Sequence, residues 1–213
     1  GLWGNVVSQI EKTNDSGYII SGFVYENTIC GEPNNTSWWI CKLNSNLEVV
    51  WSQKYGNGNG TVSPNKIKVL PNNEIVAIGT TYCTNGNGGG INNMGEGTWL
   101  AKLNASGGII FNEFIGVNMI DYTKAYSDID HSCDQNLLLA GSSGSLLGSS
   151  YFVEKFDYNL NLIEGSTVYF DPVTNYNYQK IGIRSGTDKS YLLFGYKDFG
   201  TSNNSYSFVA KTL

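Results

Sequence analysis

An internal repeat is the feature that most constrains this fold. Four segments each read as a short β strand with a glycine at one shared register, and each follows a polar turn. A chain that writes one strand four times is expected to build four equivalent units that stack on one another. The segments are "GYIISGFVY" (17–25), "EIVAIGTTY" (74–82), "NLLLAGSS" (136–143) and "SYLLFGYK" (190–197), with glycines Gly22, Gly79, Gly141 and Gly195.

A second strand follows each glycine strand and carries an aromatic residue with a lysine three positions later. Successive lysines are 60, 53 and 56 residues apart, which sets the period. Because the lysine recurs in every copy, we interpret it as a structural contact across the unit and not as a catalytic base. The pairs are Trp39/Lys42, Trp99/Lys102, Phe152/Lys155 and Phe208/Lys211.

Two more strands complete each unit. Asn44, Asn104 and Asp157 are predicted to open a turn, because Asx side chains cap the local backbone. A third strand follows (49–56, 109–116 and a degenerate copy at 165–170), and a leading strand precedes each glycine strand. The repeated glycine is expected where two backbones approach closely or a bulge occurs.

Four strands per unit of about 55 residues predict an all-β, β-propeller-like fold of about four four-stranded antiparallel blades, complete or truncated. We expect one domain over residues 1–213, with repeats at approximately 5–57, 62–117, 123–171 and 175–213. Residues 1–5 are a candidate for the strand that copy four lacks. All four prolines (Pro33, Pro64, Pro71 and Pro172) are expected in loops.

The pattern "WLAKLNASGGIIFNEFIG", preceded by "NEIVAIGTTY", resembles the β-propeller repeat of bacterial secreted and surface proteins. That resemblance extends over nearly the whole chain at the level of the repeat, and it implies a propeller fold and an extracellular or cell-surface location. Here Asn and Ser replace the Asp that is usual in the turn. A repeat motif of this kind implies a fold more than an activity.

Composition narrows the partners. Lys and Arg total 13 against 18 Asp and Glu, and no basic cluster occurs, so nucleic acid and anionic membranes are poor partners. No apolar run is long enough for a membrane span. The start at Gly1 carries no signal peptide, which suggests that one was removed. Cys30, Cys41, Cys83 and Cys133 form no CxxC pair, so a zinc site is not expected; they are free or form one or two disulfides.

The densest group of reactive side chains is "SDIDHSCDQN", which holds Asp128, Asp130, His131, Cys133 and Asp134. It could be read as a metal site or a Cys–His pair. Strand alternation would place the two flanking acids on one face and the histidine on the other, so a polar turn is the preferred interpretation. No catalytic residue, metal or cofactor is assigned, and the chain is not expected to be an enzyme.

Four aromatic residues fall outside the repeat registers and are the candidate binding residues: Trp38, Tyr82, Tyr176 and Tyr178. The preferred function is a non-catalytic module that binds a glycan or surface protein through the blade loops, as a monomer or as part of a larger polypeptide. One alternative is a carbohydrate-active hydrolase or lyase with acidic residues at the propeller channel. Another is a structural spacer within a larger surface protein.

Overall fold

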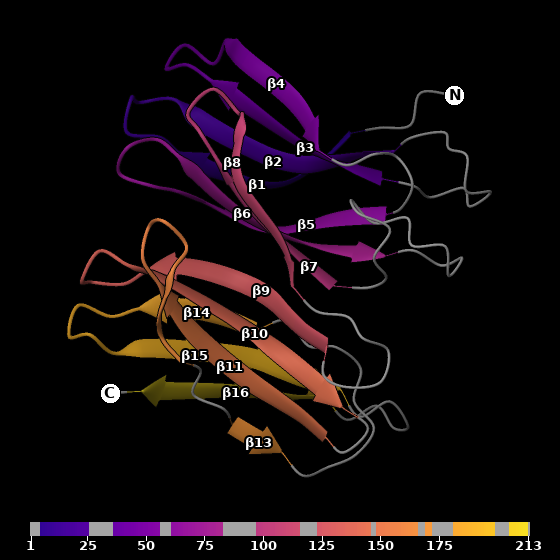
Figure 1. Ribbon diagram of the computed structural model, residues 1–213, viewed down its shortest axis with the longest axis vertical. Helices are drawn as coiled ribbons and strands as arrows, with labels where there is room; N and C mark the ends of the chain where they lie inside the picture. Colours follow the sequence, from indigo (N-terminus) through magenta and orange to yellow (C-terminus); the bar gives the residue numbers. More distant parts are fainter. Residues whose placement is uncertain are drawn as a thin grey trace. The chain divides into compact units, whose positions relative to one another are not determined.

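The computed structural model describes residues 5–25, 36–55, 61–82, 97–115, 123–145, 148–165, 169–171, 181–198 and 205–212. These residues form β strands joined by tight turns, and no helix occurs among them (Figure 1). The chain divides into two compact units, residues 1–117 and 118–213. The all-β antiparallel architecture expected from the sequence is therefore confirmed, and each unit is described separately below.

The first unit contains two antiparallel sheets of four strands each, in sequential order. One parallel pair, Thr36 with Thr61, joins them at their edges. Sheet 1 consists of β1 (Asn5–Lys12), β2 (Tyr18–Tyr25), β3 (Thr36–Leu43) and β4 (Val49–Tyr55). Sheet 2 consists of β5 (Thr61–Val69), β6 (Ile75–Tyr82), β7 (Gly97–Leu103) and β8 (Ile109–Ile115).

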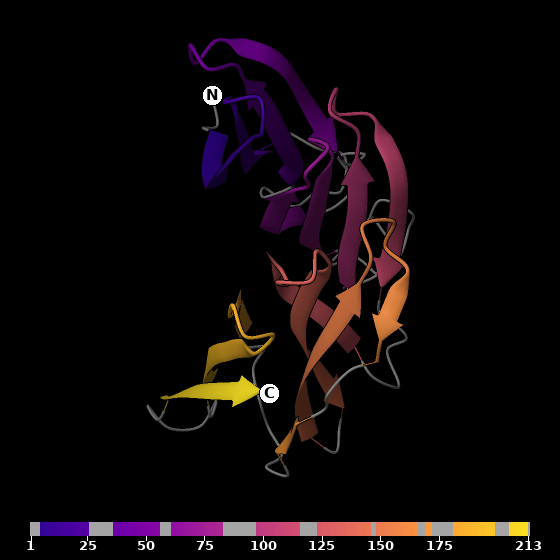
Figure 2. The same ribbon diagram turned by 90° about the vertical axis from the view of Figure 1, so that its left-hand side faces the viewer.

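The second unit contains a five-stranded and a three-stranded antiparallel sheet, seen as separate layers in Figure 2. Sheet 3 consists of β9 (Thr123–His131), β10 (Leu137–Ser145), β11 (Gly148–Phe156), β12 (Leu162–Glu164) and β13 (Tyr169–Asp171). Sheet 4 consists of β14 (Ile181–Ser185), β15 (Tyr191–Asp198) and β16 (Ser205–Thr212). In place of the third strand expected at 165–170, the short strands β12 and β13 pair with opposite ends of β11.

The repeated glycine lies at a close approach between strands, as expected. A Cβ at Gly22 would lie 2.0 Å from the carbonyl oxygen of Val6, and one at Gly141 would lie 2.1 Å from that of Ala125. Both contacts adjoin a register shift between the leading strand and the glycine strand. Any side chain at these two positions would collide with backbone, which explains why glycine occupies them.

One proline departs from the expectation. Pro64 lies within β5, opposite Gly79 and beside the register shift in that pair of strands. A strand tolerates proline where a bulge already interrupts the hydrogen-bonded ladder. Pro71 does lie in a turn, and Pro33 and Pro172 fall outside the described residues.

The turns repeat one backbone conformation. The fourth residue of six turns has a positive φ near 61–65° although it is not glycine; the residues are Ser16, Leu47, Asn73, Gln135, Leu160 and Lys189. In three turns an Asx oxygen at the first position accepts two downstream amide protons, and these first residues are the predicted Asn44, Asn104 and Asp157. The turn prediction is confirmed, because the Asx oxygen satisfies amides that the strands leave free.

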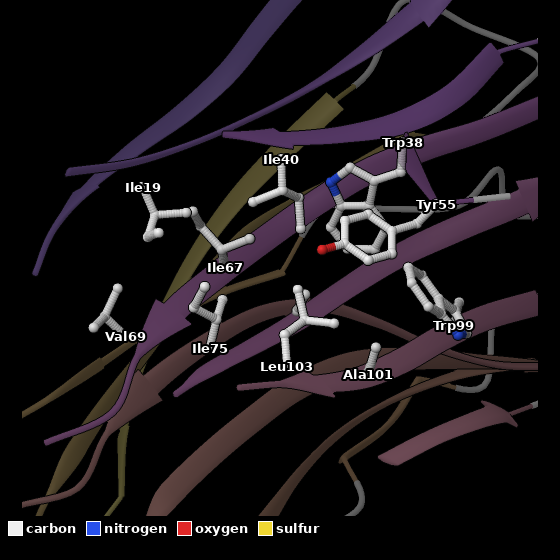
Figure 3. Packing of buried hydrophobic residues seen from close by; sticks show 11 residues of the cluster. Ile19, Trp38, Ile40, Tyr55, Ile67, Val69, Ile75, Trp99, Ala101 and Leu103 are labelled. Carbon is white, nitrogen blue, oxygen red and sulfur yellow. The ribbon is translucent and has the colours of Figure 1, made fainter. Parts of the chain in front are cut away.

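The core of the first unit lies between its two sheets (Figure 3). Trp38 of sheet 1 meets Trp99 of sheet 2 edge to face, with ring centroids 5.1 Å apart, and the Tyr55 ring lies beside them. Gly79 leaves room for the Trp38 ring, since a Cβ there would lie 2.8 Å from a ring carbon. The second unit has its own core between sheets 3 and 4, formed by Leu138, Ala140, Val153, Ile181, Ile183 and Leu193.

Candidate functional site

The repeated lysine forms an ion pair in each of the four sheets. Each lysine lies on the third strand of its sheet and reaches the turn between the first two strands. This confirms a structural contact within the sheet. The nitrogen–oxygen distances are 2.6 Å for Lys42–Asp15, 2.6 Å for Lys102–Glu74, 2.5 Å for Lys155–Asp134 and 3.0 Å for Lys211–Asp188.

The second sheet achieves this contact with a different acid. Asn72 occupies the turn position where the other turns carry aspartate, and its side-chain oxygen accepts the backbone N–H of Glu74. The longer side chain of Glu74, two residues later, reaches Lys102 instead. The pairing is therefore retained although the residue at the turn register has changed.

These pairs control the protonation of the turn acids. Hydrogen bonds from Lys42 and Thr13 lower the pKa of Asp15 from 3.8 to about 2. Hydrogen bonds from Lys155 and Ser132 likewise hold the pKa of Asp134 well below its usual range. The hydrogen bond between Lys155 and Asp134 also raises the pKa of Lys155. Charged acids held at low pKa stabilise the turns at neutral pH and are unsuited to proton donation.

The acidic cluster is divided between a strand and a turn. Asp128, Asp130 and His131 belong to β9, so the turn interpretation is wrong for these three and holds for Cys133 and Asp134. Asp128 and Asp130 lie on this strand and join sheet 3 to sheet 4.

Asp128 and Asp130 bind the neighbouring leading strand of sheet 4. One oxygen of Asp128 accepts the backbone N–H of Ile183 at 3.0 Å and the Arg184 guanidinium at 2.9 Å. Asp130 accepts the backbone N–H of Ser185 at 3.1 Å. Two carboxylates thus satisfy backbone amides of β14, one of them buried, which is a structural use of acids.

The remaining members of the cluster do not converge. The His131 ring meets Tyr158 edge to face, with its Nδ1 3.4 Å from the tyrosine oxygen, while Asp134 turns to Lys155. Cys133 is exposed and Cys41 is buried, and both are free thiols. Among the described residues, no group of three or more His, Cys, Asp or Glu side chains could hold a metal ion.

One buried acid stands apart from the cluster. Glu154 of β11 is 6% exposed and accepts a hydrogen bond from the hydroxyl of the buried Tyr126 on β9. The tyrosine ring also packs edge to face on Phe152 and Phe156. The pair links two strands of sheet 3 through its aromatic core. Sequence reasoning missed it because the two residues are 28 positions apart.

The candidate binding aromatics have different outcomes. The candidate Trp38 is fully buried, and its indole N–H donates to the Ser21 hydroxyl at 2.7 Å. Gly79 leaves a space between the two sheets that the Trp38 ring fills. A ring enclosed in this way has no free face for a ligand. Tyr82 ends β6, but its side chain falls outside the described residues, as do Tyr176 and Tyr178 altogether.

Strand order separates two kinds of connection. In every sheet the turn after the first strand lies at one end, and in sheets 1 to 3 the turn after the third strand lies at the same end; the second strand stops and the third begins at the opposite end. The first kind is tight and hydrogen-bonded, and it includes the ion-paired turns. The number of residues between the second and third strands differs from sheet to sheet: the segments are 26–35, 83–96, 146–147 and 199–204.

Comparison with known proteins adds little. No family model matches the chain, and no curated protein matches it either. One solved structure that is similar is an endo-arabinase from Bacteroides thetaiotaomicron, at 8% sequence identity and a TM-score of 0.48. The alignment covers all of this chain and 75% of the arabinase chain. Within the described residues there is no helix long and apolar enough to cross a membrane.

Proposed function

We propose that this chain is a β-propeller-type repeat module that binds a glycan or a protein without catalysing a reaction. The four sheets would be blades, stacked face to face as sheets 1 and 2 are and as sheets 3 and 4 are. An extracellular or cell-surface setting is part of the proposal, since it rests on the resemblance of the repeat.

One observation carries the proposal: the four sheets share the same turn and ion pair at one end, but differ at the other end in the number of residues between the second and third strands. The fixed end has the same backbone turn and the same lysine–carboxylate pair in every sheet. At the other end the second strand stops and the third begins, and 10, 14, 2 and 6 residues separate them in sheets 1 to 4. A rigid scaffold that presents variable loops is the usual arrangement in binding proteins.

The composition of those connections supports recognition. The segment 83–96, between the second and third strands of sheet 2, is rich in Asn and Gly. The segment 172–180, between the last strand of sheet 3 and the first strand of sheet 4, contains Tyr176 and Tyr178 within "NYNYQ". Tyr, Ser, Gly and Asn also dominate antibody loops, where rigid rings supply contact area and small polar residues supply adaptable hydrogen bonds. The conspicuous acids, in contrast, are engaged in turns and between sheets.

A glycan array and a pull-down with surface proteins test the proposal. We expect the Tyr176→Ala/Tyr178→Ala double variant to reduce binding at least about tenfold with an unchanged melting temperature. Tyr158→Ala is the matched control, because Tyr158 lies in a turn at the fixed end of sheet 3. Equal loss in the control, or turnover of a bound glycan by the wild-type chain, would contradict the proposal.

A further inference from the structure

The outer face of sheet 1 is apolar and exposed. Ile10 is paired with Ile20, two residues before the repeated glycine, and is 59% exposed. Its counterparts at the same register are Ile67 in sheet 2 and Ile183 in sheet 4. Both are fully buried, because sheet 1 packs on Ile67 and sheet 3 packs on Ile183. Ile10 therefore occupies a position that a neighbouring sheet covers elsewhere in the chain.

Sheet 4 has the complementary exposed face. Leu192 is 43% exposed, Phe194 is 40% exposed and Val209 is 73% exposed, and the strand pairing places all three on the side away from sheet 3. The corresponding residues of sheet 3 are buried beneath sheet 4; they are Leu138 (5%), Ala140 (0%) and Val153 (4%). An apolar patch at registers that are otherwise buried indicates an interaction surface.

The contacts between neighbouring sheets follow one rule in both units. A polar side chain on the leading strand of the earlier sheet binds the backbone of the next leading strand. The Gln9 amide pairs with both the N–H and the carbonyl of Ile67, at 2.9 and 3.0 Å. The Ser127 hydroxyl does the same with Ile181, at 3.0 and 2.7 Å. In both units these hydrogen bonds therefore run from a side chain of the earlier sheet to the backbone of the later sheet.

Charge alternates along the leading strands at one register. The residue paired three positions before the repeated glycine is Glu11, Lys68, Asp130 and Arg184 in sheets 1 to 4. Glu11 pairs with Lys68 at 3.2 Å within the first unit. In the second unit Arg184 pairs with Asp128, two residues before this register, while Asp130 accepts the backbone N–H of Ser185. After the arginine of sheet 4, an acid on the next sheet would continue the alternation.

We propose that sheet 4 of one copy of this chain packs on sheet 1 of a second copy, head to tail. Sheet 1 supplies the acid at this register, Glu11, whose carboxylate would then bind Arg184 of the second copy as well as Lys68 of its own. It also supplies the exposed Ile10, which would lie opposite Leu192 and Phe194. The Arg184 side chain is 51% exposed and has donors beyond the one that binds Asp128, so it can bind this second carboxylate. The proposal departs from the monomer expected from the sequence, and it does not depend on the proposed ligand binding.

The test is the molar mass of the full chain as a function of concentration, by light scattering and sedimentation. We expect assemblies of two or more copies, since head-to-tail contacts either close into a ring or continue as a filament. Phe194→Asp and Ile10→Asp should each weaken association at least about tenfold, because each places a charge in an apolar contact. Leu47→Asp is the control, since Leu47 is 65% exposed but lies in a turn; it should leave the mass unchanged.

Mixing the two variants identifies the geometry. Phe194→Asp keeps an intact sheet 1 face and Ile10→Asp keeps an intact sheet 4 face, so the mixture should form a pair that neither variant forms alone. Thermal melts confirm that each variant folds, which exposed positions permit. A wild-type monomer at every concentration, association unaffected by either variant, or a mixture that stays monomeric would each overturn the proposal.

Discussion

Replacing Asp15 by asparagine isolates the contribution of the lysine–carboxylate pair to stability. The Lys42 side chain is 7% exposed, and its ammonium donates to Thr13 and Asp15 at 2.6 Å each. Without the carboxylate, a largely buried cation keeps one neutral hydroxyl and one amide oxygen. An uncompensated buried charge is costly, whereas the exposed partner alone is not.

The magnitude follows from the protonation equilibrium of the pair. A pKa lowered from 3.8 to about 2 corresponds to at most about 2.5 kcal/mol. The Asp15 side chain is 53% exposed, so solvent screening reduces this contribution. We expect Asp15→Asn to lower the free energy of unfolding by about 1–2 kcal/mol. Lys42→Met should cost less than about 1 kcal/mol, because the remaining carboxylate stays hydrated.

Sheet 4 offers a matched control. Lys211 and Asp188 form the same pair at the same register, but their side chains are 53% and 56% exposed. Asp188→Asn should therefore cause no measurable change in unfolding. The main difference between the two pairs is burial, and Thr13, which binds Lys42, is replaced by Gly186 in the turn of sheet 4.

The assay can separate the two units. All five tryptophans lie within residues 1–117, so tryptophan fluorescence during urea unfolding reports the first unit, and far-UV circular dichroism also reports the second. Asp15→Asn should move the fluorescence transition to lower urea. Equal effects of Asp15→Asn and Asp188→Asn, or a greater cost for Lys42→Met than for Asp15→Asn, would refute the reasoning.

Three further predictions concern the first unit. Trp38→Ala should lower the free energy of unfolding in urea by about 3–5 kcal/mol, because it empties a fully buried site between two sheets. A loss no larger than that caused by removing an exposed aromatic side chain would contradict this packing. Leu47→Gly should stabilise by about 0.5 kcal/mol, since φ is 65° there and the side chain is exposed, and a lower melting temperature would disprove it. The depressed pKa of Asp15 supplies stability that is present above pH 4 and lost as pH falls toward 2, so the stability difference between wild type and Asp15→Asn should vanish across that window.

Much of the fold could be predicted from the sequence, because the same residue types recur at the same positions of each repeat. The four glycine strands, the Asx turns and the structural use of the lysine were all predicted. The glycine is readable because only a missing side chain tolerates a carbonyl oxygen 2.0 Å from the Cβ position. The replacement of the single strand expected at 165–170 by β12 and β13 was not predictable, since these strands are each three residues long and have no periodic pattern.

The candidate site was less predictable. Trp38 looked exceptional in the sequence because Thr98 and Tyr151 occupy its register in other copies. An exception to a repeat can be a ligand contact or a local packing solution, and only the opposing sheet distinguishes them. The glycine at position 79 was visible, but its role as the space for this ring was not.

The sequence by itself determined the strands, their order within a sheet and the turns, because alternation and Asx capping act over a few residues. The tertiary structure alone decided which face of each sheet is covered. Ile10, Ile67 and Ile183 share one register, yet the first is exposed and the other two are buried. Burial depends on which sheet packs opposite, and that contact joins residues more than 50 positions apart.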